Sequence, residues 1–464
     1  MSNATPIVAE ENRRAVAPPR PLPAVAALVR AVAQGEGDLL ALLPGKAYQV
    51  EAGWLGWSRR SILIVNKPEW VRAVLQDEDG VFPKSDLMVG ALEPLIGQSI
   101  FVSSGETWRR QRRMVAPAFS QLRLADAFDR INAAIADYET RLADMAASGD
   151  GFSLDLAMSH LTADVICRTV FSTSLDSAAA QEVFEDFKVF ERSVAHVEMR
   201  RLIFDPPFKD IEQSPQVLEA CQRIRRHLLA LVQSHLAADA AFNDIASDMI
   251  AAVDPETGAR FSDDELVDQL GVFFLAGHET TASALTWSFF MLASRPKMLA
   301  RLRAEIEEVT QGRPLAFDHV SKLSFAQNIV KEALRLYPPI TFLPRVAERP
   351  TQIGPYRLRR GAMVMIAPWA LHRHRMYWKD PDAFDPDRFS PERAGELTAG
   401  AYIPFGQGKR VCVGANFAAV ESAMILARLA RRFDFSVLNP EAVRPVARLT
   451  TRSETEIQCR VVQR

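Results

Sequence analysis

A glycine-rich loop around Cys412 constrains this chain more than any other feature. Between residues 405 and 414 the sequence reads Phe-Gly-Gln-Gly-Lys-Arg-Val-Cys-Val-Gly. Glycine adopts positive φ angles easily and lets the backbone approach a flat ligand closely. We therefore expect tight turns at Gly406, Gly408 and Gly414. Backbone N–H groups in such a loop can point at the sulfur, which favours the thiolate over the thiol.

The surroundings of Cys412 indicate which metal it would bind. A zinc site needs about four protein ligands and an iron–sulfur cluster needs several cysteines, and neither set occurs near Cys412. One thiolate suits a haem iron, whose in-plane ligands come from the porphyrin. Phe405 would shield the sulfur from water, and Arg410 supplies a cation for an anionic group of the ligand.

The loop resembles the haem-binding signature of the cytochrome P450 monooxygenases at all six defining positions, which are Phe405, Gly406, Gly408, Arg410, Cys412 and Gly414. The resemblance implies a mainly α fold, a helical bundle around haem with a small β-sheet portion. It implies haem b (iron protoporphyrin IX) as the cofactor and Cys412 as the iron ligand, with cofactor contacts from Phe405, Gly406, Arg410 and Gly414.

A second motif lies on the longest predicted helix. The sequence Ser262-Asp263-Asp264-Glu265 has the pattern of a capping box with acids at the positive end of the helix dipole. The helix is predicted to continue through Leu266–Ala293 and to end near Pro296. Within it, Gly277 costs about 1 kcal/mol relative to alanine, so we expect it to leave room for a ligand against the helix. Thr280 is expected to hydrogen bond the Ala276 carbonyl.

The segment around these residues resembles the oxygen-activating motif of the same family. The resemblance implies that Glu279 and Thr280 are the catalytic acid–alcohol pair that relays protons, and that Ala276 and Gly277 lie against the cofactor. His278 occupies the variable position of the motif. We interpret it as a helix-packing residue or a solvent contact.

The haem propionates are expected to bind arginines, because the guanidinium fork pairs well with carboxylates. The resemblance implies that four side chains hold them, namely Trp108, Arg112, Arg345 and Arg410. The neighbouring Arg109, Arg110 and Arg113 form either a solvated helix face or a dock for an acidic ferredoxin.

Two further sets of residues follow from the resemblance. Glu332 and Arg335, three residues apart on one helix, and Arg388 are expected to form a structural ion-pair network behind the haem loop. An apolar substrate pocket is expected from Phe82, Leu87, Met88, Phe101, Val194, Met199, Phe204, Phe273, Phe274, Ile340, Thr341, Phe342 and Leu343.

Helical periodicity dominates the rest of the chain. It predicts helices over Ala125–Ala147, Asp155–Phe171, Pro215–Ala238 and Lys297–Thr310. The strand signals are few: a strand at Ile62–Val65, and a hairpin made of Tyr356–Leu358 and Ala362–Ile366. No linker or internal repeat divides the chain, so residues 1–464 are expected to form a single domain, with 1–40 as a partly flexible, proline-rich lead-in.

Composition narrows the partners and the compartment. A formal net charge of -2 provides no global field for nucleic acid or anionic lipid. The four cysteines are widely spaced and form no CxxC or CxxCH pattern, which suits a reducing compartment. The apolar segment at residues 24–33 is too short to span a bilayer. We therefore expect a cytoplasmic protein without a membrane anchor. Microsomal members of the resembled family carry such an anchor, so the resemblance implies an enzyme of bacterial type, expected to be a monomer.

The resemblance implies a monooxygenase that inserts one oxygen atom of O2 into a hydrophobic organic substrate, such as a fatty acid, terpene, steroid or aromatic. Electrons are expected from NAD(P)H through a separate ferredoxin and ferredoxin reductase, because no flavin or iron–sulfur domain is visible. Two alternatives stay open at this point. They are a peroxide-driven haem-thiolate peroxygenase and a non-catalytic haem-binding sensor.

Overall fold

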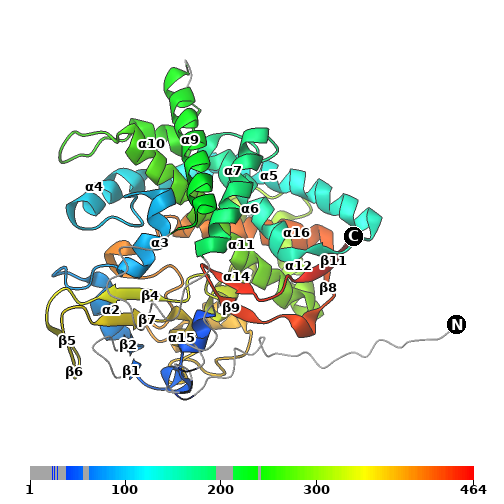
Figure 1. Cartoon of the computed structure of the whole chain (residues 1–464). Coiled ribbons are helices and arrows are strands. Elements are labelled where there is room, and N and C mark those ends of the chain that lie inside the picture. The colour runs from blue at the N-terminus through cyan, green and yellow to red at the C-terminus, as the bar shows by residue number, and fades with distance from the viewer. Residues whose placement is uncertain are drawn as a thin grey trace.

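The computed structural model describes residues 23, 26, 29, 38–55, 62–194, 213–238 and 242–464, the side chains of 41, 42 and 86–89 excepted. The lead-in predicted over residues 1–40 therefore lies almost wholly outside the described residues. In Figure 1 most of the helices gather in the upper part of the view, and the strands β1, β2, β4 and β7 lie below them at the left.

The fold is mainly helical, as expected. The described α-helices are α2 (Pro68–Gln76), α3 (Asp86–Ile96), α4 (Gly105–Val115), α5 (Gln121–Ser148), α6 (Leu154–Phe171), α7 (Ala178–Val194), α9 (Pro215–Ala237), α10 (Ile245–Ala251), α11 (Asp263–Ala293), α12 (Pro296–Thr310), α13 (Phe317–Val320), α14 (Ser324–Leu336), α15 (Pro368–Leu371) and α16 (Ala415–Arg432). The short 3-10 helices are η1 (Leu39–Leu42), η2 (Gly45–Tyr48), η3 (Ala116–Phe119), η4 (Pro386–Phe389), η5 (Ala394–Glu396), η6 (Gly408–Arg410) and η7 (Pro440–Ala442). The helices predicted from periodicity are confirmed as α5, α6, α9 and α12.

Helix α11 is the long central helix of the fold (Figure 1). Its predicted capping box is present, since Ser262 Oγ accepts from the Glu265 N–H and Glu265 Oε2 accepts from the Ser262 N–H. Most of its residues are buried, and α6 packs along it. The helix ends at Ala293, before Pro296 opens α12.

The strands form four small sheets. The largest has the order β1 (Ala52–Leu55), β2 (Ile62–Val65), β7 (Met363–Ile366), β4 (Leu343–Val346), with β2 and β7 parallel and the other pairs antiparallel. A three-stranded antiparallel sheet has the order β3 (Phe152–Ser153), β11 (Gln458–Gln463), β8 (Phe433–Val437). The remaining antiparallel pairs are β9 (Pro445–Ala447) with β10 (Thr451–Ser453), and β5 (Thr351–Ile353) with β6 (Tyr356–Leu358).

The hairpin predicted from residues 356–358 and 362–366 is wrong, although both segments are strands. Strand β6 pairs with β5 through the two-residue turn Gly354-Pro355, where Gly354 has φ 52°. Strand β7 instead lies between β2 and β4, with Leu63 opposite Val364. Its side chains at 364–366 are buried. Strands on both sides of β7 provide partners for its buried backbone N–H and C=O groups, whereas a hairpin with β6 would provide partners on one side only.

Two hydrophobic clusters share helix α11. Its first half contributes Leu266 to Leu275 to a cluster with α3, α6, α7 and α9. Its second half contributes Ala282 to Leu292 to a cluster with α5, α14 and α16. The residues between them, 276–281, belong to neither cluster. The core is therefore interrupted where the oxygen-activating motif was predicted.

Candidate haem-thiolate site

The Cys412 loop connects η6 to α16. Gly406 and Gly408 adopt positive φ angles of 74° and 76°. A Cβ on Gly408 would lie 2.6 Å from the Leu75 carbonyl oxygen of α2, so this close approach requires glycine. The expected left-handed turn at Gly414 is wrong, because Gly414 is the N-cap of α16 with φ -88°.

The Cys412 side chain is exposed, and its backbone N–H donates to the Phe405 carbonyl at 3.0 Å. Phe405 itself is half-buried against the larger core cluster. Surrounding protein raises the pKa of the Cys412 thiol above its ordinary value, although the Gly414 N–H and Arg112 favour the thiolate. The predicted N–H group favouring the thiolate is thus present at Gly414, but the surrounding protein outweighs its effect on the pKa. A coordinated metal would remove the proton, because metal coordination deprotonates a thiol outright.

Trp108 and Arg112, one turn apart on α4, both face the Cys412 loop. The guanidinium of Arg410 lies 4.4 Å from the Trp108 ring centroid, in a cation–π contact. Arg112 Nη1 donates to the carbonyl of Val411 at 2.9 Å. Helix α4 is therefore fixed to the two residues that directly precede Cys412.

Arg345 on β4 and Arg410 gather with a cation that the sequence reasoning missed, Lys84. Lys84 forms a β-bridge with Arg345, and its Nζ donates to the Phe101 carbonyl. Burial lowers the pKa of Arg345 and of Arg410 to about 10. Burial, followed by repulsion from Arg410 and Arg345, lowers the pKa of Lys84 well below its ordinary value. An isolated lysine before a helix carries no sequence signal of this kind.

This cluster fits a dianionic ligand. Arg410 Nη1 is buried and has no hydrogen-bond partner, and Arg345 Nη1 donates only to the neighbouring Pro344 carbonyl at 3.0 Å. Buried cations need partners. Two carboxylates, such as the propionates of haem, would supply them.

The predicted contact of Thr280 is confirmed, since its Oγ1 donates to the Ala276 carbonyl at 2.7 Å. Ala276 is exposed and Thr280 half-buried, so this side of α11 is accessible. The expectation for Gly277 needs correction. A Cβ on Gly277 would lie 2.5 Å from Ile166 Cδ1, so its missing side chain allows close packing of α6 and does not leave room for a ligand.

Glu279 is held by the C-terminal part of the chain. Its Oε1 accepts from Thr450 Oγ1 at 2.6 Å and from Arg452 Nε at 2.9 Å. Arg452 Nη2 donates to the other carboxylate oxygen. Burial opposes the charge of Glu279, but Arg452 outweighs it and lowers the pKa of the carboxyl below its ordinary value.

His278 is a packing residue and not a solvent contact. It is fully buried, and its Nδ1 lies 2.7 Å from the Phe274 carbonyl. The other ring nitrogen, Nε2, lies 3.1 Å from Glu191 Oε1 of α7. Glu191 carried no sequence signal, because nothing in its local pattern places it against the motif.

The predicted network behind the haem loop is confirmed. Arg335 Nε and Nη2 donate to the two carboxylate oxygens of Glu332, each at 2.7 Å. Arg388 Nε reaches Glu332 Oε1 at 3.3 Å. All three side chains are buried. Arg335 also donates to three backbone carbonyls, those of His372, Pro381 and Ala383.

The predicted substrate-pocket residues divide into buried, half-buried and undescribed groups, and Thr341 and Phe342 belong to the buried group. Phe274 belongs to the core, with its ring 4.3 Å from that of Phe187. Phe273 is buried against Phe119 at 5.1 Å, edge to face. Ile340 remains half-buried, as do Phe82, Phe101, Val194 and Leu343. Met199 and Phe204 lie outside the described residues, and so do the side chains of Leu87 and Met88.

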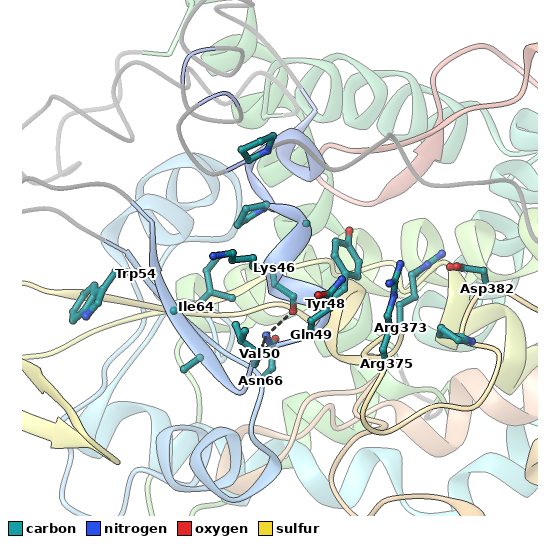
Figure 2. A pocket seen from close by; sticks show the side chains of 17 residues that line it. Lys46, Tyr48, Gln49, Val50, Trp54, Ile64, Asn66, Arg373, Arg375 and Asp382 are labelled. Atoms are coloured by element: carbon teal, nitrogen blue, oxygen red, sulfur yellow. Dashed lines mark hydrogen bonds between the residues drawn. The ribbon is translucent and has the colours of Figure 1, made fainter.

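A cavity of about 730 Å³ lies elsewhere, beside η2, β1 and β2. Figure 2 shows Tyr48 and Arg373 on its wall, together with Lys46, Trp54 and Asp382. Its lining includes neither the Cys412 loop nor residues 276–280. This cavity is therefore separate from the candidate site.

The basic run on α4 is largely neutralised. Arg109 pairs with Glu106 at 2.7 Å, Arg110 pairs with Glu265, and Arg113 Nε lies 2.9 Å from Asp254. Arg110 and Arg113 are only half-exposed. Arg109 remains exposed, so these residues form a partly solvated, ion-paired helix face. Among the described residues, no helix combines the length and apolar character required to cross a membrane.

Comparison with known proteins identifies the class. The family model for cytochrome P450 matches residues 18–458. The cyclooctat-9-en-7-ol 5-monooxygenase of Streptomyces melanosporofaciens is 33% identical over 408 residues, 85% of this chain and 84% of its own. Cyclooctatin synthase of the same organism is 33% identical over 415 residues, 88% of this chain and 87% of its own.

The similarity extends to solved structures. A crystal structure of the cytochrome P450DA heme domain matches with a TM-score of 0.78 and 26% identity, covering 89% of this chain and 90% of that one. The chain belongs to the cytochrome P450 family. It is a haem-thiolate monooxygenase, and the family's cofactor is haem.

Proposed function

We propose that this monooxygenase oxidises a hydrophobic organic molecule with O2. The main support is that α11 is accessible at Ala276 and Thr280, in the stretch between the two hydrophobic clusters. Phe273 of the same helix packs edge to face against Phe119, which adds apolar side chains to this part of the fold. Within the class of fatty acids, terpenes, steroids and aromatics, the relative named for cyclooctat-9-en-7-ol favours a cyclic, largely hydrocarbon substrate.

The proposed cofactor is haem b, with the Cys412 sulfur as the protein ligand of its iron. Haem supplies the binding and reductive activation of O2 when it is bound. Arg345, Arg410 and Lys84 supply buried cations for its propionates. The remaining contacts are assigned to Trp108, Arg112, Phe405, Gly406, Gly414, Ala276 and the backbone of Gly277.

Thr280 and Glu279 are the proposed proton-delivery pair. The Thr280 hydroxyl donates to the Ala276 carbonyl, which orients its oxygen on the accessible side of α11. Glu279 is the adjacent carboxylate, and Arg452 keeps it charged and able to accept a proton. Positioned acid–base groups of this kind typically contribute about 10²–10⁴-fold to a rate.

Electrons are proposed to come from NAD(P)H through a ferredoxin and its reductase. Because Arg109, Arg110 and Arg113 are ion-paired, the docking surface proposed here moves to cations around the Cys412 loop. Lys409 is exposed within η6, and Arg112 is half-exposed beside Val411. Charge reversal at Lys409 should reduce the association rate with ferredoxin and weaken its salt dependence.

The experiment is a ligand screen followed by turnover. Purified holoenzyme is titrated with fatty acids, terpenes, steroids and aromatics, and binding is read from the shift of the Soret band. Hits are incubated with NADPH, ferredoxin, ferredoxin reductase and isotopically labelled O2. We expect one labelled oxygen atom in the product. Greater activity with hydrogen peroxide alone would assign a peroxygenase, and no substrate-dependent oxygen consumption with any hit would assign a sensor.

A further inference from the structure

His278 occupies a closed aromatic environment in the middle of α11. Its ring lies 6.1 Å from the rings of Phe184 and Phe187 on α7 and 4.8 Å from that of Phe274. Thr162 of α6 donates to the His278 carbonyl at 3.0 Å. The imidazole is therefore fixed in position, with only its two ring nitrogens available for polar contacts.

The contacts of His278 favour a proton at its second ring nitrogen, because Nε2 and Glu191 Oε1 are both buried and have no hydrogen-bond partner elsewhere among the described residues. A backbone carbonyl only accepts, so the contact of 2.7 Å with Phe274 places a proton on Nδ1. Nε2 lies 3.1 Å from Glu191 Oε1. If the imidazole carried its only proton on Nδ1 and Glu191 were ionised, the lone pair of Nε2 would face a lone pair of Glu191 Oε1 and the two would repel each other. One additional proton between Nε2 and Oε1 removes that repulsion.

The charged groups around Glu191 and His278 also favour an additional proton on this pair. The nearest ligand atoms of Glu191, His278 and Glu279 all lie within 4.8 Å of one another. Arg452 pairs with Glu279, and Asp155 of α6 is a further carboxyl near Arg452. Without a proton on the pair, these buried and half-buried groups carry more negative than positive charge, which is costly away from bulk water. Burial disfavours imidazolium, yet Glu191 raises the pKa of His278 above its ordinary value. Burial and then Glu279 also raise the pKa of Glu191, so both directions favour one proton on the pair.

A metal ion between the three ligand atoms would also supply positive charge. Arg452 opposes this, because it donates to both carboxylate oxygens of Glu279 and Thr450 donates to one of them. A cation at this position would have to displace those donors. A proton requires no such rearrangement.

We propose that Glu191 and His278 share one proton, carried on Nε2 at neutral pH, and that this pair reprotonates Glu279 during turnover. This rests on the proposed roles of Glu279 and Thr280. The side chain of Glu191 is 16% exposed, that of Glu279 9% and that of His278 1%, so Glu191 is the point at which solvent reaches the pair. The ligand atoms of His278 and Glu279 lie within 4.8 Å of one another without an ion pair, and the proton crosses this gap through one bridging water. Insertion of one oxygen atom from O2 into a C–H bond consumes two electrons and two protons and releases water, and each delivered proton is replaced from solvent through Glu191. His278 acts through Glu279 and is thus a positioning residue.

The first experiment locates the proton without relying on turnover. The holoenzyme is labelled with ¹⁵N-histidine, treated with a chelator and studied by NMR as the diamagnetic ferrous carbon monoxide complex. His278→Gln assigns the signal. We expect protons on both ring nitrogens at pH 7 and loss of the Nε2 proton in Glu191→Gln. An unprotonated Nε2 in the wild-type protein at pH 6 would overturn the proposal.

The second experiment measures coupling, the product formed per NADPH consumed. Glu191→Gln and His278→Gln should keep haem content and substrate-induced spectral shifts while coupling falls about tenfold, near the low end of typical acid–base contributions. Glu191→Asp should recover part of the loss. Glu185→Gln is the matched control, because Glu185 lies on the same helix, is 65% exposed and pairs with Lys188.

The pH profile separates a relay from a packing role. Because the pKa of His278 is raised, its proton is present at low pH and is lost as pH rises through that raised value. Wild-type coupling should therefore decline at alkaline pH, and the decline should begin at lower pH in Glu191→Gln. Unchanged coupling and an unchanged pH profile in both glutamine variants would refute the relay. A failure of the wild type to form product would instead refute the proposed function, and the NMR result would still stand.

Discussion

Arg452 of β10 donates hydrogen bonds to both carboxylate oxygens of Glu279 on α11. A strand near the C-terminus therefore holds Glu279 in place beside Thr280. Glu279 is buried and Arg452 is half-buried, and each raises the stability of the other's charge. A buried ion pair contributes little net stability over an apolar substitute, but loss of one partner leaves an uncompensated charge. The contact thus couples the position of Glu279 to the packing of the C-terminal strands.

Arg452→Met tests this coupling. We expect a loss of about 3–5 kcal/mol in the free energy of unfolding at pH 7, because Glu279 stays buried without its cation. In the wild type the pKa of Glu279 is lowered, so its contribution is present above pH 4.5 and is lost as pH falls through the lowered value. In the variant that pKa should rise and the trend should reverse, with stability falling above about pH 4.5. Denaturant unfolding across pH 4–8 checks this, with the exposed Arg460→Met on β11 as control.

Thr280→Ala tests proton delivery at the accessible side of α11. The hydroxyl that donates to the Ala276 carbonyl is removed, while the residues assigned to the haem and the substrate remain. We expect normal haem content, spectral shift and NADPH consumption, but product per NADPH should fall by about tenfold or more as hydrogen peroxide is released. Thr280→Ser should restore coupling. Wild-type coupling in the alanine variant would make Thr280 a packing residue.

Cys412→Ser tests the iron ligand. Serine keeps the size of the side chain and the backbone contact with Phe405, but its hydroxyl is not deprotonated as the thiol is when coordinated. The reduced carbon monoxide complex should lose the red-shifted Soret band of a thiolate. Cys221→Ala, a change at a buried cysteine of α9, should retain it. A thiolate spectrum in the serine variant would place the ligand elsewhere.

Local contacts could be predicted from the sequence, whereas contacts between distant segments could not. The capping box of α11 and the Thr280 contact were predictable, because both depend on residues three or four positions apart. The partner of β7 was not, since β2 lies about 300 residues earlier and no local signal selects it over β6. The turn Gly354-Pro355 did carry a signal for the true hairpin, because glycine at the first position suits a tight two-residue loop.

The candidate site shows the same division. The loop glycines and Cys412 could be identified from spacing, but Lys84 and Glu191 join the site only through the packing of distant segments. The prediction for Gly277 was wrong because the sequence does not show which segment packs against a glycine, and here that segment is α6 with Ile166. The direction of the Cys412 pKa shift depends on how much protein surrounds the sulfur, which the sequence does not contain.

Arg345→Met tests whether the cationic cluster is built for an anion. Burial lowers the pKa of Arg345 to about 10, so at pH 7 its charge destabilises the folded haem-free protein, and this penalty declines only as pH rises above that value. The haem-free variant should therefore be more stable than the wild type, by on the order of 1–3 kcal/mol.

The Arg345→Met holoenzyme should lose haem faster than the wild type, as measured by transfer to apomyoglobin. Lys84→Met should behave likewise, and the exposed Arg109→Met should change neither property. Faster unfolding of the haem-free Arg345→Met protein together with normal haem retention would contradict a propionate role.

Glu332→Gln tests the network behind the haem loop. The carboxylate accepts from Arg335 Nε and Nη2, from Arg388 Nε and from the Asp385 N–H. A carboxamide keeps one acceptor oxygen but turns an NH2 group toward a guanidinium, so two buried arginines lose their anion. We expect a loss of about 3–5 kcal/mol in the free energy of unfolding, as for other buried pairs from which one partner is removed.

The control for Glu332→Gln is Asp387→Asn. Asp387 pairs with Arg301 at 2.8 Å, with the two side chains 42% and 55% exposed, and exposed pairs contribute about 0–1 kcal/mol. Both variants are compared with the wild type by urea unfolding of the holoenzyme, followed by fluorescence and by the Soret band. Because Arg335 also binds three backbone carbonyls from residues 372 to 383, the loss in Glu332→Gln should appear in both signals at the same urea concentration. Equal midpoints for the two variants would mean that the backbone carbonyls, and not Glu332, hold Arg335 in place.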